Sequence, residues 1–241
     1  MTVPARRTTG HAVPGTDDDT ADDDTAVTDT TVADTAVAGT AADGTAVAVP
    51  ARWLAWLLVT GGLTGLLAAF TLTIERFALL EDPSYTPSCS INPVLSCGSV
   101  MTTPQAEVLG FPNPLLGIAG FAVVTVLGTV LLAGAILPRW FWLVIQAGVT
   151  LGAIFVHWLI FQSLYRIDAL CPYCMVVWAV MIPVFWYTTL HTLAHHLRTA
   201  PTWWRGAVRR LAGCHGVVLT AWYLLIVVLI VQRFWLYWTS L

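Results

Sequence analysis

The sequence contains no lysine, and only 10% of its 241 residues are charged. A soluble globular domain carries about 25% charged residues. Hydrophobic residues make up 57% of the chain, and the mean hydropathy is +0.73. This shortage of charge excludes an ordinary soluble domain and predicts an integral membrane protein. We therefore expect the chain to contact the lipid bilayer. We expect no nucleic-acid partner.

Residues 1–50 lack aromatic residues, leucine and isoleucine, so they have no side chains from which to build a core. Nine aspartates against Arg6 and Arg7 give this segment a net charge of −7, whereas the rest of the chain carries +4. Such a composition cannot offset the entropy of ordering a chain. We therefore predict that residues 1–50 form a disordered acidic tail. No basic segment followed by an apolar run precedes residue 50, so a cleaved signal peptide is not expected.

Five apolar stretches follow, each near the roughly 20 residues with which a helix spans a bilayer. Only helices satisfy their own backbone groups singly in lipid. The stretches cover about 53–74, 114–137, 140–162, 170–190 and 216–238. They predict an all-α integral membrane protein. Residues 51–190 would form a four-transmembrane-helix bundle with a cysteine-bearing loop between its first two helices. Residues 191–215 would form a basic loop, and 216–241 a fifth transmembrane helix outside the bundle.

Two short connections refine this arrangement. Little more than Pro138 and Arg139 joins the second and third stretches, so we expect these two to pack as an antiparallel hairpin. The connection at 163–169 is similarly short. It carries Arg166 and Asp168, which we expect to form a surface pair rather than to tune a nearby cysteine.

The arginines predict the orientation of the chain, because positive charge accumulates in cytoplasmic loops. One side of the membrane would carry Arg52, Arg139, Arg198, Arg205, Arg209 and Arg210, and the other Arg76, Arg166 and Arg233. The first side, with the N-terminus, is predicted to be cytoplasmic. The loop at 75–113 and the start of the fourth helix then face outward, so two pairs of cysteines lie on or near the extracytoplasmic side.

The second cysteine pair is Cys171-Pro172-Tyr173-Cys174, at the start of the fourth apolar stretch. Helix positions i and i+3 are close enough for a disulfide after small adjustments. Pro172 suits the first helical turn, and the helix dipole favours a thiolate there. This pattern predicts a redox-active pair. A structural disulfide or a metal site remains the alternative, although no His or Cys cluster is placed to complete a zinc shell.

The first pair, Cys89 and Cys97, has seven residues between its members in the outward loop. A ring this small gains less loop-closure stabilisation than a long one. The pair is therefore consistent with a disulfide that is made and broken during turnover. A static loop staple is the alternative. Cys214 belongs to neither pair and is expected to be a free cytoplasmic thiol.

The ordered set of four cysteines, with Phe111-Pro112-Asn113 before the second span, resembles the vitamin K epoxide reductase family in its bacterial branch. The resemblance covers roughly residues 52–190. DsbB-type oxidases carry the two cysteine pairs in the opposite order. Some bacterial relatives have a thioredoxin-like domain after the fifth span, whereas this sequence ends at Leu241. The resemblance therefore implies a separate DsbA-like or thioredoxin-like partner and a place in the bacterial cytoplasmic membrane.

The resemblance also implies a role for each catalytic cysteine. Cys89 would form a mixed disulfide with the partner, Cys97 would pass reducing equivalents to Cys171, and Cys174 would face a quinone, either menaquinone or ubiquinone. We expect a membrane thiol:quinone oxidoreductase that supports disulfide bond formation. Direct reduction of a quinone epoxide is a second enzymatic possibility. A membrane scaffold or transporter with structural disulfides is the non-enzymatic one.

The quinone-binding residues are predicted less directly. Asn113 matches a family donor to a quinone carbonyl, but it could equally be a helix N-cap before Pro114. Thr103 matches a family hydroxyl position, or is an ordinary loop residue. Trp178 lies one helical turn beyond Cys174, where it could wall an aromatic pocket or simply pack against neighbours. Phe111 is a further candidate. His157 is a polar residue inside the third span, and an interhelical hydrogen bond is expected for it.

Overall fold

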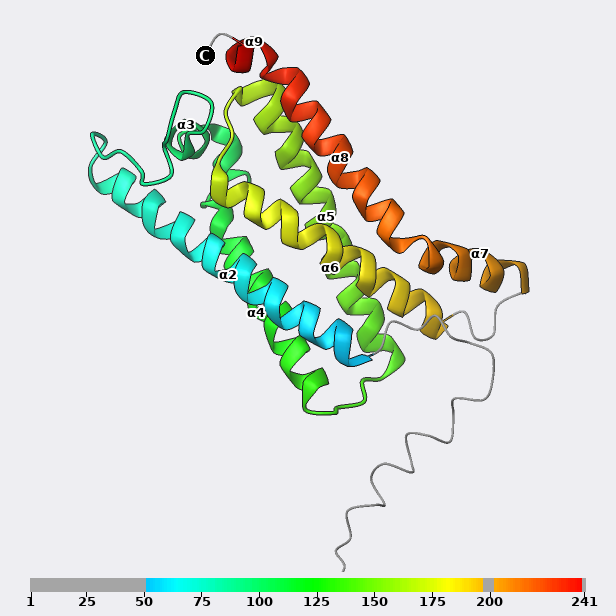
Figure 1. Cartoon of the computed structure of the whole chain (residues 1–241). Helices are drawn as coiled ribbons and strands as arrows, with labels where there is room; N and C mark the ends of the chain where they lie inside the picture. The colour runs from blue at the N-terminus through cyan, green and yellow to red at the C-terminus, as the bar shows by residue number, and fades with distance from the viewer. Residues whose placement is uncertain (1–50, 197–201, 240–241) are drawn as a thin grey trace, which may run out of the picture. The chain divides into compact units, whose positions relative to one another are not determined.

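The computed structural model describes residues 51–196 and 202–239, so the predicted acidic tail lies outside the described residues. The elements are α2 (Ala51–Glu81), α3 (Cys97–Met101), η1 (Pro104–Glu107), α4 (Asn113–Leu132), α5 (Arg139–Gln162), η2 (Ser163–Ile167), α6 (Pro172–His196), α7 (Thr202–Gly213), α8 (His215–Arg233) and α9 (Trp235–Thr239). Figure 1 shows the long helices running side by side.

The described residues contain five helices that are long and apolar enough to cross a membrane, namely α2, α4, α5 with η2, α6 and α8. The chain is therefore an all-α, multi-pass membrane protein, as its composition predicted. α2 continues to Glu81, seven residues beyond the predicted end of the first span. The loop that follows is correspondingly shorter and contains α3 and η1.

α2 and α4 approach each other closely because glycines lie at their crossing. A Cβ atom on Gly62 would lie 2.8 Å from the backbone nitrogen of Thr125, and one on Gly128 would lie 2.7 Å from that of Val59. Small residues let transmembrane helices bring their backbones together. Van der Waals contact then stabilises the pair, because the hydrophobic effect does not drive helices together in lipid. These glycines explain why α4 packs along α2.

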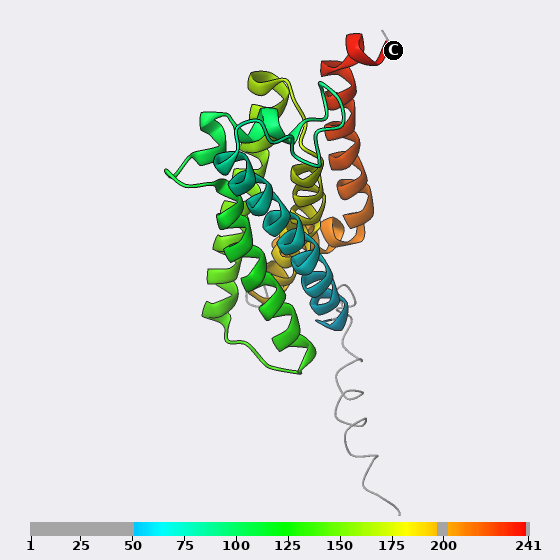
Figure 2. The ribbon, with the colours of Figure 1, turned by 90° about the vertical axis from the view of Figure 1, so that its left-hand side faces the viewer.

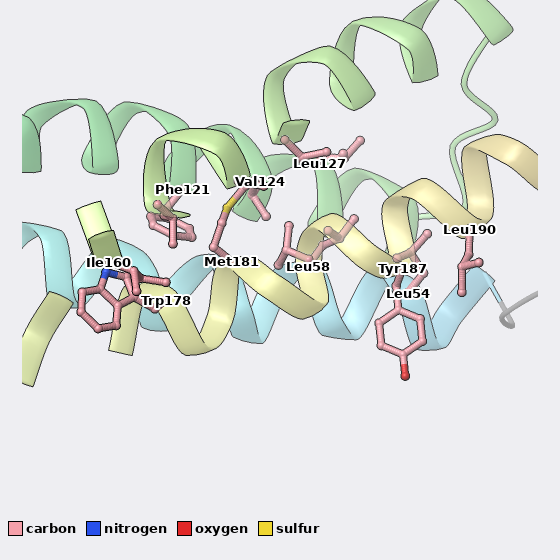
Figure 3. Close-up of a cluster of buried hydrophobic side chains, with 14 of the residues drawn as sticks. Leu54, Leu58, Phe121, Val124, Leu127, Ile160, Trp178, Met181, Tyr187 and Leu190 are labelled. Carbon is pink, nitrogen blue, oxygen red and sulfur yellow. The ribbon is translucent and has the colours of Figure 1, made fainter. Parts of the chain in front are cut away.

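The other extensive helix contacts join α2 to α6 and α5 to α6. α4 and α5, by contrast, make at most marginal backbone contact in the described residues. The two helices run antiparallel, as predicted, but the predicted packing of one against the other is wrong, because α4 turns its close-packing glycine face toward α2. Figure 3 shows the apolar core that results, with α2 and α6 contributing Leu58 and Met181 beside Phe121 of α4.

α8 lies outside this bundle, along α5 and α6 and away from α4 (Figures 1 and 2). Two polar contacts fix it there. The indole N–H of Trp222 donates to Nε2 of His157 at 2.9 Å, and the hydroxyl of Tyr223 donates to the carbonyl of Ala179 at 2.6 Å. The interhelical hydrogen bond expected for His157 is thus confirmed. Its partner is on the fifth span.

One end of the bundle carries both cysteine pairs. There α2 ends, α4 and α6 begin, and α3 covers the helix ends (Figure 1). We call it the cysteine-bearing end. At the opposite end, the predicted basic loop at 191–215 contains a helix, α7, which the sequence pattern did not reveal.

Candidate active site

The loop after α2 is closed by a disulfide between Cys89 and Cys97, whose Cα atoms are 5.6 Å apart. Cys97 is the first residue of α3. Ser96 caps this short helix, since its hydroxyl accepts the backbone N–H of Ser99 at 3.3 Å. Serine is favoured at an N-cap for this reason. The cap fixes the backbone at the point where Cys97 leaves the loop.

A short backbone pairing docks this loop on the segment that leads into α6. The N–H of Leu170 donates to the carbonyl of Val94 at 2.7 Å, and the N–H of Ser96 donates to the carbonyl of Leu170 at 2.9 Å. Cys97 and Cys171 are the next residues on the two paired segments. Their Sγ atoms lie 3.2 Å apart. The structure thus brings together two of the four predicted catalytic cysteines from opposite pairs.

The sulfurs at this contact are shielded from water. Cys97 and Cys171 are both 0% exposed, and Cys89 is 5% exposed. Leu72 and Met101 belong to the same buried cluster. Thiol–disulfide exchange needs a thiolate beside a disulfide, and here a free thiol at Cys171 faces the bonded sulfur of Cys97. The arrangement supports exchange between the two pairs without access to solvent.

Cys171 immediately precedes the first residue of α6, where helix N–H groups are unpaired. Its Sγ accepts the backbone N–H of Cys174 at 3.4 Å. A hydrogen bond from the Cys174 thiol lowers the pKa of the Cys171 thiol below its ordinary value, with burial opposing it and backbone hydrogen bonds adding to it. Cys171 therefore has the environment of a nucleophilic cysteine. Cys174 is half-buried and remains a free thiol.

A buried carboxylate, which the sequence pattern did not reveal, anchors the segment before Cys89. Glu75 on α2 is 7% exposed. It accepts hydrogen bonds from the hydroxyl and the N–H of Ser88 and, at 2.9 Å, from the hydroxyl of Tyr85. The last bond raises the pKa of Tyr85. Because burying a carboxylate is costly unless it is hydrogen-bonded, these donors hold the residue preceding Cys89 against α2.

The next residue of α2 anchors the other part of the same loop. The guanidinium of Arg76 forms an ion pair with Glu107 at the end of η1. Arg76 is largely buried, with 12% of its side chain exposed. Consecutive charged residues at the end of a transmembrane helix therefore fasten two different segments of the loop. The signal that could have found them is their position, since charged residues in an apolar stretch usually have partners.

Asn113 is buried at the start of α4, where both ends of its amide bind its own loop. Its Nδ2 donates to the carbonyl of Gln105 at 2.7 Å, and its Oδ1 accepts the N–H of Val108 at 3.2 Å. The hydroxyl of Thr103 donates to the carbonyl of Val100 at 2.8 Å. Phe111 is 38% exposed. These contacts organise the loop, and they use only one of the two N–H groups of the Asn113 amide.

Trp178 is 3% exposed on α6 and belongs to the apolar cluster that contains Ile160 and Met181 (Figure 3). Its indole N–H is buried and has no hydrogen-bond partner among the described residues. Most buried donors in proteins are paired. The indole N–H of Trp178, one helical turn from Cys174, is therefore a buried donor without an acceptor among the described residues.

The remaining reactive side chains lie away from this site. Cys214 is an exposed free thiol between α7 and α8, at the opposite end of the bundle. The residues that the structure describes contain no group of His, Cys, Asp or Glu arranged to hold a metal ion. Asp168 pairs with Arg233 of α8. The predicted surface pair of Arg166 with Asp168 is therefore wrong.

Comparison with known proteins places this sequence in a family. The family model described as "Vitamin K epoxide reductase family" matches residues 56–189, which is more than half of the chain. The chain belongs to the vitamin K epoxide reductase family. Like that family, it is a membrane oxidoreductase, and the family uses quinone. The matched stretch contains both cysteine pairs and ends before α8. A search of curated proteins found no match.

Proposed function

We propose that this protein is a thiol:quinone oxidoreductase that oxidises a DsbA-like or thioredoxin-like partner and reduces a membrane quinone. One observation carries the proposal, namely the 3.2 Å contact between the Sγ atoms of Cys97 and Cys171, which joins the two cysteine pairs. Membership of a family of membrane oxidoreductases supports it. The four cysteines would form a relay, with one pair serving the partner and the other serving the quinone.

In the first step, a thiolate of the reduced partner attacks Cys89 of the Cys89–Cys97 disulfide. A second partner thiolate then resolves the mixed disulfide, so the partner is oxidised and Cys89 and Cys97 become thiols. Cys89 is 5% exposed, so the loop that carries it must open for a partner thiolate to reach its Sγ atom, and the segment held by Glu75 lies directly before it. Exchange of this kind conserves electrons, since one disulfide breaks as another forms.

In the second step, the thiolate of Cys97 attacks Cys171 of the Cys171–Cys174 disulfide and releases the Cys174 thiolate. Cys89 then attacks Cys97 and releases Cys171. This restores the Cys89–Cys97 bond and leaves the second pair reduced, which is the state of the structure. Hydrogen bonding that stabilises the Cys171 thiolate favours its departure as a leaving group.

The last step returns Cys171 and Cys174 to a disulfide while two electrons and two protons convert quinone to quinol. We assign Trp178 and Asn113 as hydrogen-bond donors to the quinone carbonyls, since each has an N–H to spare. Thr103 and Phe111 would border the site. A groove of about 190 Å³ between α2 and α6, lined by Gly61, Ala179 and Pro183 among others, would take an apolar tail.

For this cycle to support disulfide formation, the cysteine-bearing end must face the extracytoplasmic side of a bacterial cytoplasmic membrane. The arginine distribution favours this orientation, with the N-terminus in the cytoplasm. The catalytic unit would comprise 51–190, with 191–215 and 216–241 as a cytoplasmic connection and a fifth span. Arg139, Arg205 and Arg209 lie at the opposite end of the bundle from the four cysteines, in agreement with this view.

The test is quinone reduction by the purified protein, driven by a reduced thioredoxin-fold protein. Replacing Cys171 or Cys174 by Ala should abolish it, because neither single thiol can be oxidised to the intramolecular disulfide. Replacing Cys214 by Ala should leave the rate unchanged. Turnover that survives in either catalytic variant would refute the proposal, and so would cysteine redox states that do not respond to added quinone.

A further inference from the structure

We propose that Arg233, the last residue of α8, is a positioning residue for the sulfur relay. It would hold the turn between α5 and α6 so that Cys171 stays in register with Cys97. This inference rests on the proposed function, because it concerns how the two cysteine pairs exchange. It assigns a role to the fifth span, which lies beyond the stretch matched by the family.

Arg233 makes two contacts to this turn. Its Nε donates to the backbone carbonyl of Leu164 at 2.8 Å, and its Nη2 binds the carboxylate of Asp168. The ion pair is half-exposed, at 42% for Arg233 and 56% for Asp168, so attraction between the charges alone would contribute little. The bond to the carbonyl is different, because Leu164 is 0% exposed and its backbone lies in η2. The rigid fork of the guanidinium holds both acceptors at once.

The turn itself has an unusual backbone that needs support from its surroundings. Residues 163–167 form a π-helical turn, and Asp168 adopts the left-handed conformation with φ 57°. π-Helical turns are rare in proteins overall, and those that occur are often near functional sites. Aspartate tolerates the left-handed region better than most residues, but the conformation persists only where neighbouring structure holds it. Arg233 contacts this irregular backbone directly, at Leu164 inside the π-helical turn and at Asp168 itself.

The opposite side of the same turn holds the redox loop. Leu170, two residues after Asp168, makes both backbone hydrogen bonds to Val94 and Ser96. Cys171 follows directly. A rotation of the backbone at Asp168 would therefore shift the paired segment and the sulfur of Cys171 together. Since reacting groups lose rate steeply when misplaced by about 1 Å, release of the turn by loss of Arg233 should weaken the contact between Cys97 and Cys171.

The measurement is the effective concentration of the Cys97 and Cys171 thiols toward each other. It is obtained by equilibrating the full chain carrying Cys89→Ala and Cys174→Ala in glutathione buffers of known redox ratio. The fraction bonded is read by alkylation and peptide mass spectrometry. This readout involves neither quinone nor partner. Arg233→Met should lower the effective concentration about tenfold, as expected for loss of a hydrogen bond to a charged group.

Matched variants separate positioning from charge and from folding. Arg166→Met removes a positive charge from the same turn, but Arg166 has no ion pair in the described part of the chain, so the effective concentration should not change. Arg233→Lys keeps the positive charge but lacks the planar guanidinium, so its effective concentration should lie between those of wild type and Arg233→Met. Asp168→Asn removes the ion pair but keeps a residue that tolerates the left-handed conformation. Because the hydrogen bond from Arg233 to Leu164 remains, the effective concentration should decrease less than in Arg233→Met.

The outcomes distinguish this inference from the proposed function. If Cys97 and Cys171 bond readily and neither Arg233→Met nor Asp168→Asn changes their effective concentration, the role of Arg233 is refuted while the relay stands. If the two cysteines do not bond even with Arg233 present, the relay itself fails. A second readout is single-turnover reduction of a soluble quinone by Cys171 and Cys174, with Cys89 and Cys97 replaced by Ala. Arg233→Met should leave that rate unchanged. If the rate of quinone reduction falls as much as the effective concentration does, Arg233 does not act by positioning Cys171 for exchange with Cys97.

Discussion

The Sγ atom of Cys97 lies 3.2 Å from the Sγ atom of Cys171, although 74 residues separate the two in the sequence. One sulfur belongs to a disulfide and the other to a free thiol. A single geometry serves exchange in both directions, because the forward and reverse reactions pass through the same transition state. The contact therefore describes the transfer between pairs from either starting point.

Removing Cys174 should trap this transfer. In a Cys174→Ala variant, Cys171 can still attack Cys97 and release Cys89, and only the reverse attack of Cys89 can resolve the new bond. Alkylation of the released Cys89 thiol blocks that attack, so we expect a Cys97–Cys171 disulfide with alkylated Cys89 to accumulate, identified by non-reducing peptide mass spectrometry. Cys214→Ala in the same background should give the same linkage. Recovery of only the Cys89–Cys97 peptide would contradict the exchange geometry.

The pH dependence of that trapped exchange should report the environment of Cys171. Hydrogen bonding from Cys174 lowers the pKa of Cys171, so the attacking thiolate is present at lower pH than for an ordinary thiol. A Cys174→Ser variant retains a hydroxyl donor, whereas Cys174→Ala does not. The rate of Cys97–Cys171 formation rises as Cys171 deprotonates, so its midpoint should lie at lower pH in the Ser variant than in the Ala variant. Coincident profiles would show that the donor is not important.

The membrane class, the spans and the two cysteine pairs were predictable because they depend on local pattern. Long apolar stretches specify transmembrane helices without knowledge of their partners. The cysteine spacing, with its family resemblance, pointed to the site. The docking of α8 on His157 was predicted only as an unspecified interhelical bond, since nothing in the sequence near His157 identifies Trp222.

Contacts between distant segments could not be predicted. Asp168 looked like a partner for Arg166, two residues away, but its partner is Arg233, 65 residues away. The wrong expectation for α4 and α5 has a similar cause, since a short connection does not reveal which face of a helix carries the residues of closest approach. Gly128 faces α2, and only the assembled bundle shows it.

The carboxylate of Glu75 should control how the loop presents Cys89 to a partner. Glu75→Gln replaces one accepting oxygen with a donor, and Ser88→Ala removes a hydroxyl bonded to it. Each loss is worth about 1–2 kcal/mol, so KM for the partner should rise about tenfold. Quinone reduction by chemically reduced Cys171 and Cys174 should be unaffected. Glu81→Gln, an exposed site on the same helix, is the control. Equal effects of the two Gln substitutions would argue against a specific role for Glu75.

The close approach of α2 and α4 predicts a sharp difference between two glycines of α4. Gly128→Ala places a methyl group 2.7 Å from the backbone nitrogen of Val59 and 2.9 Å from the carbonyl of Ala55, neither of which can rotate away. We expect a loss of about 1–3 kcal/mol, as for other overpacked sites. Gly120→Ala meets nothing within 4 Å and should be neutral or slightly stabilising. Thermal unfolding in detergent, followed by tryptophan fluorescence, measures the stability of both variants. Similar unfolding midpoints for the two would refute the close approach of α2 and α4 at Gly128.

Two tryptophans on α6 allow a test of the proposed quinone site. Trp178 and Trp186 both have a buried indole N–H without a partner among the described residues. Trp178→Phe keeps an apolar ring and removes the N–H, so KM for quinone should rise about five- to tenfold, the value of one hydrogen bond. Stability should not fall, since an unpaired buried donor is lost. Trp186→Phe makes the same chemical change two helical turns farther from Cys174 and should leave KM unchanged. Steady-state quinone titrations and unfolding midpoints for both variants decide the matter. An unchanged KM in Trp178→Phe would show that the indole N–H does not reach the quinone.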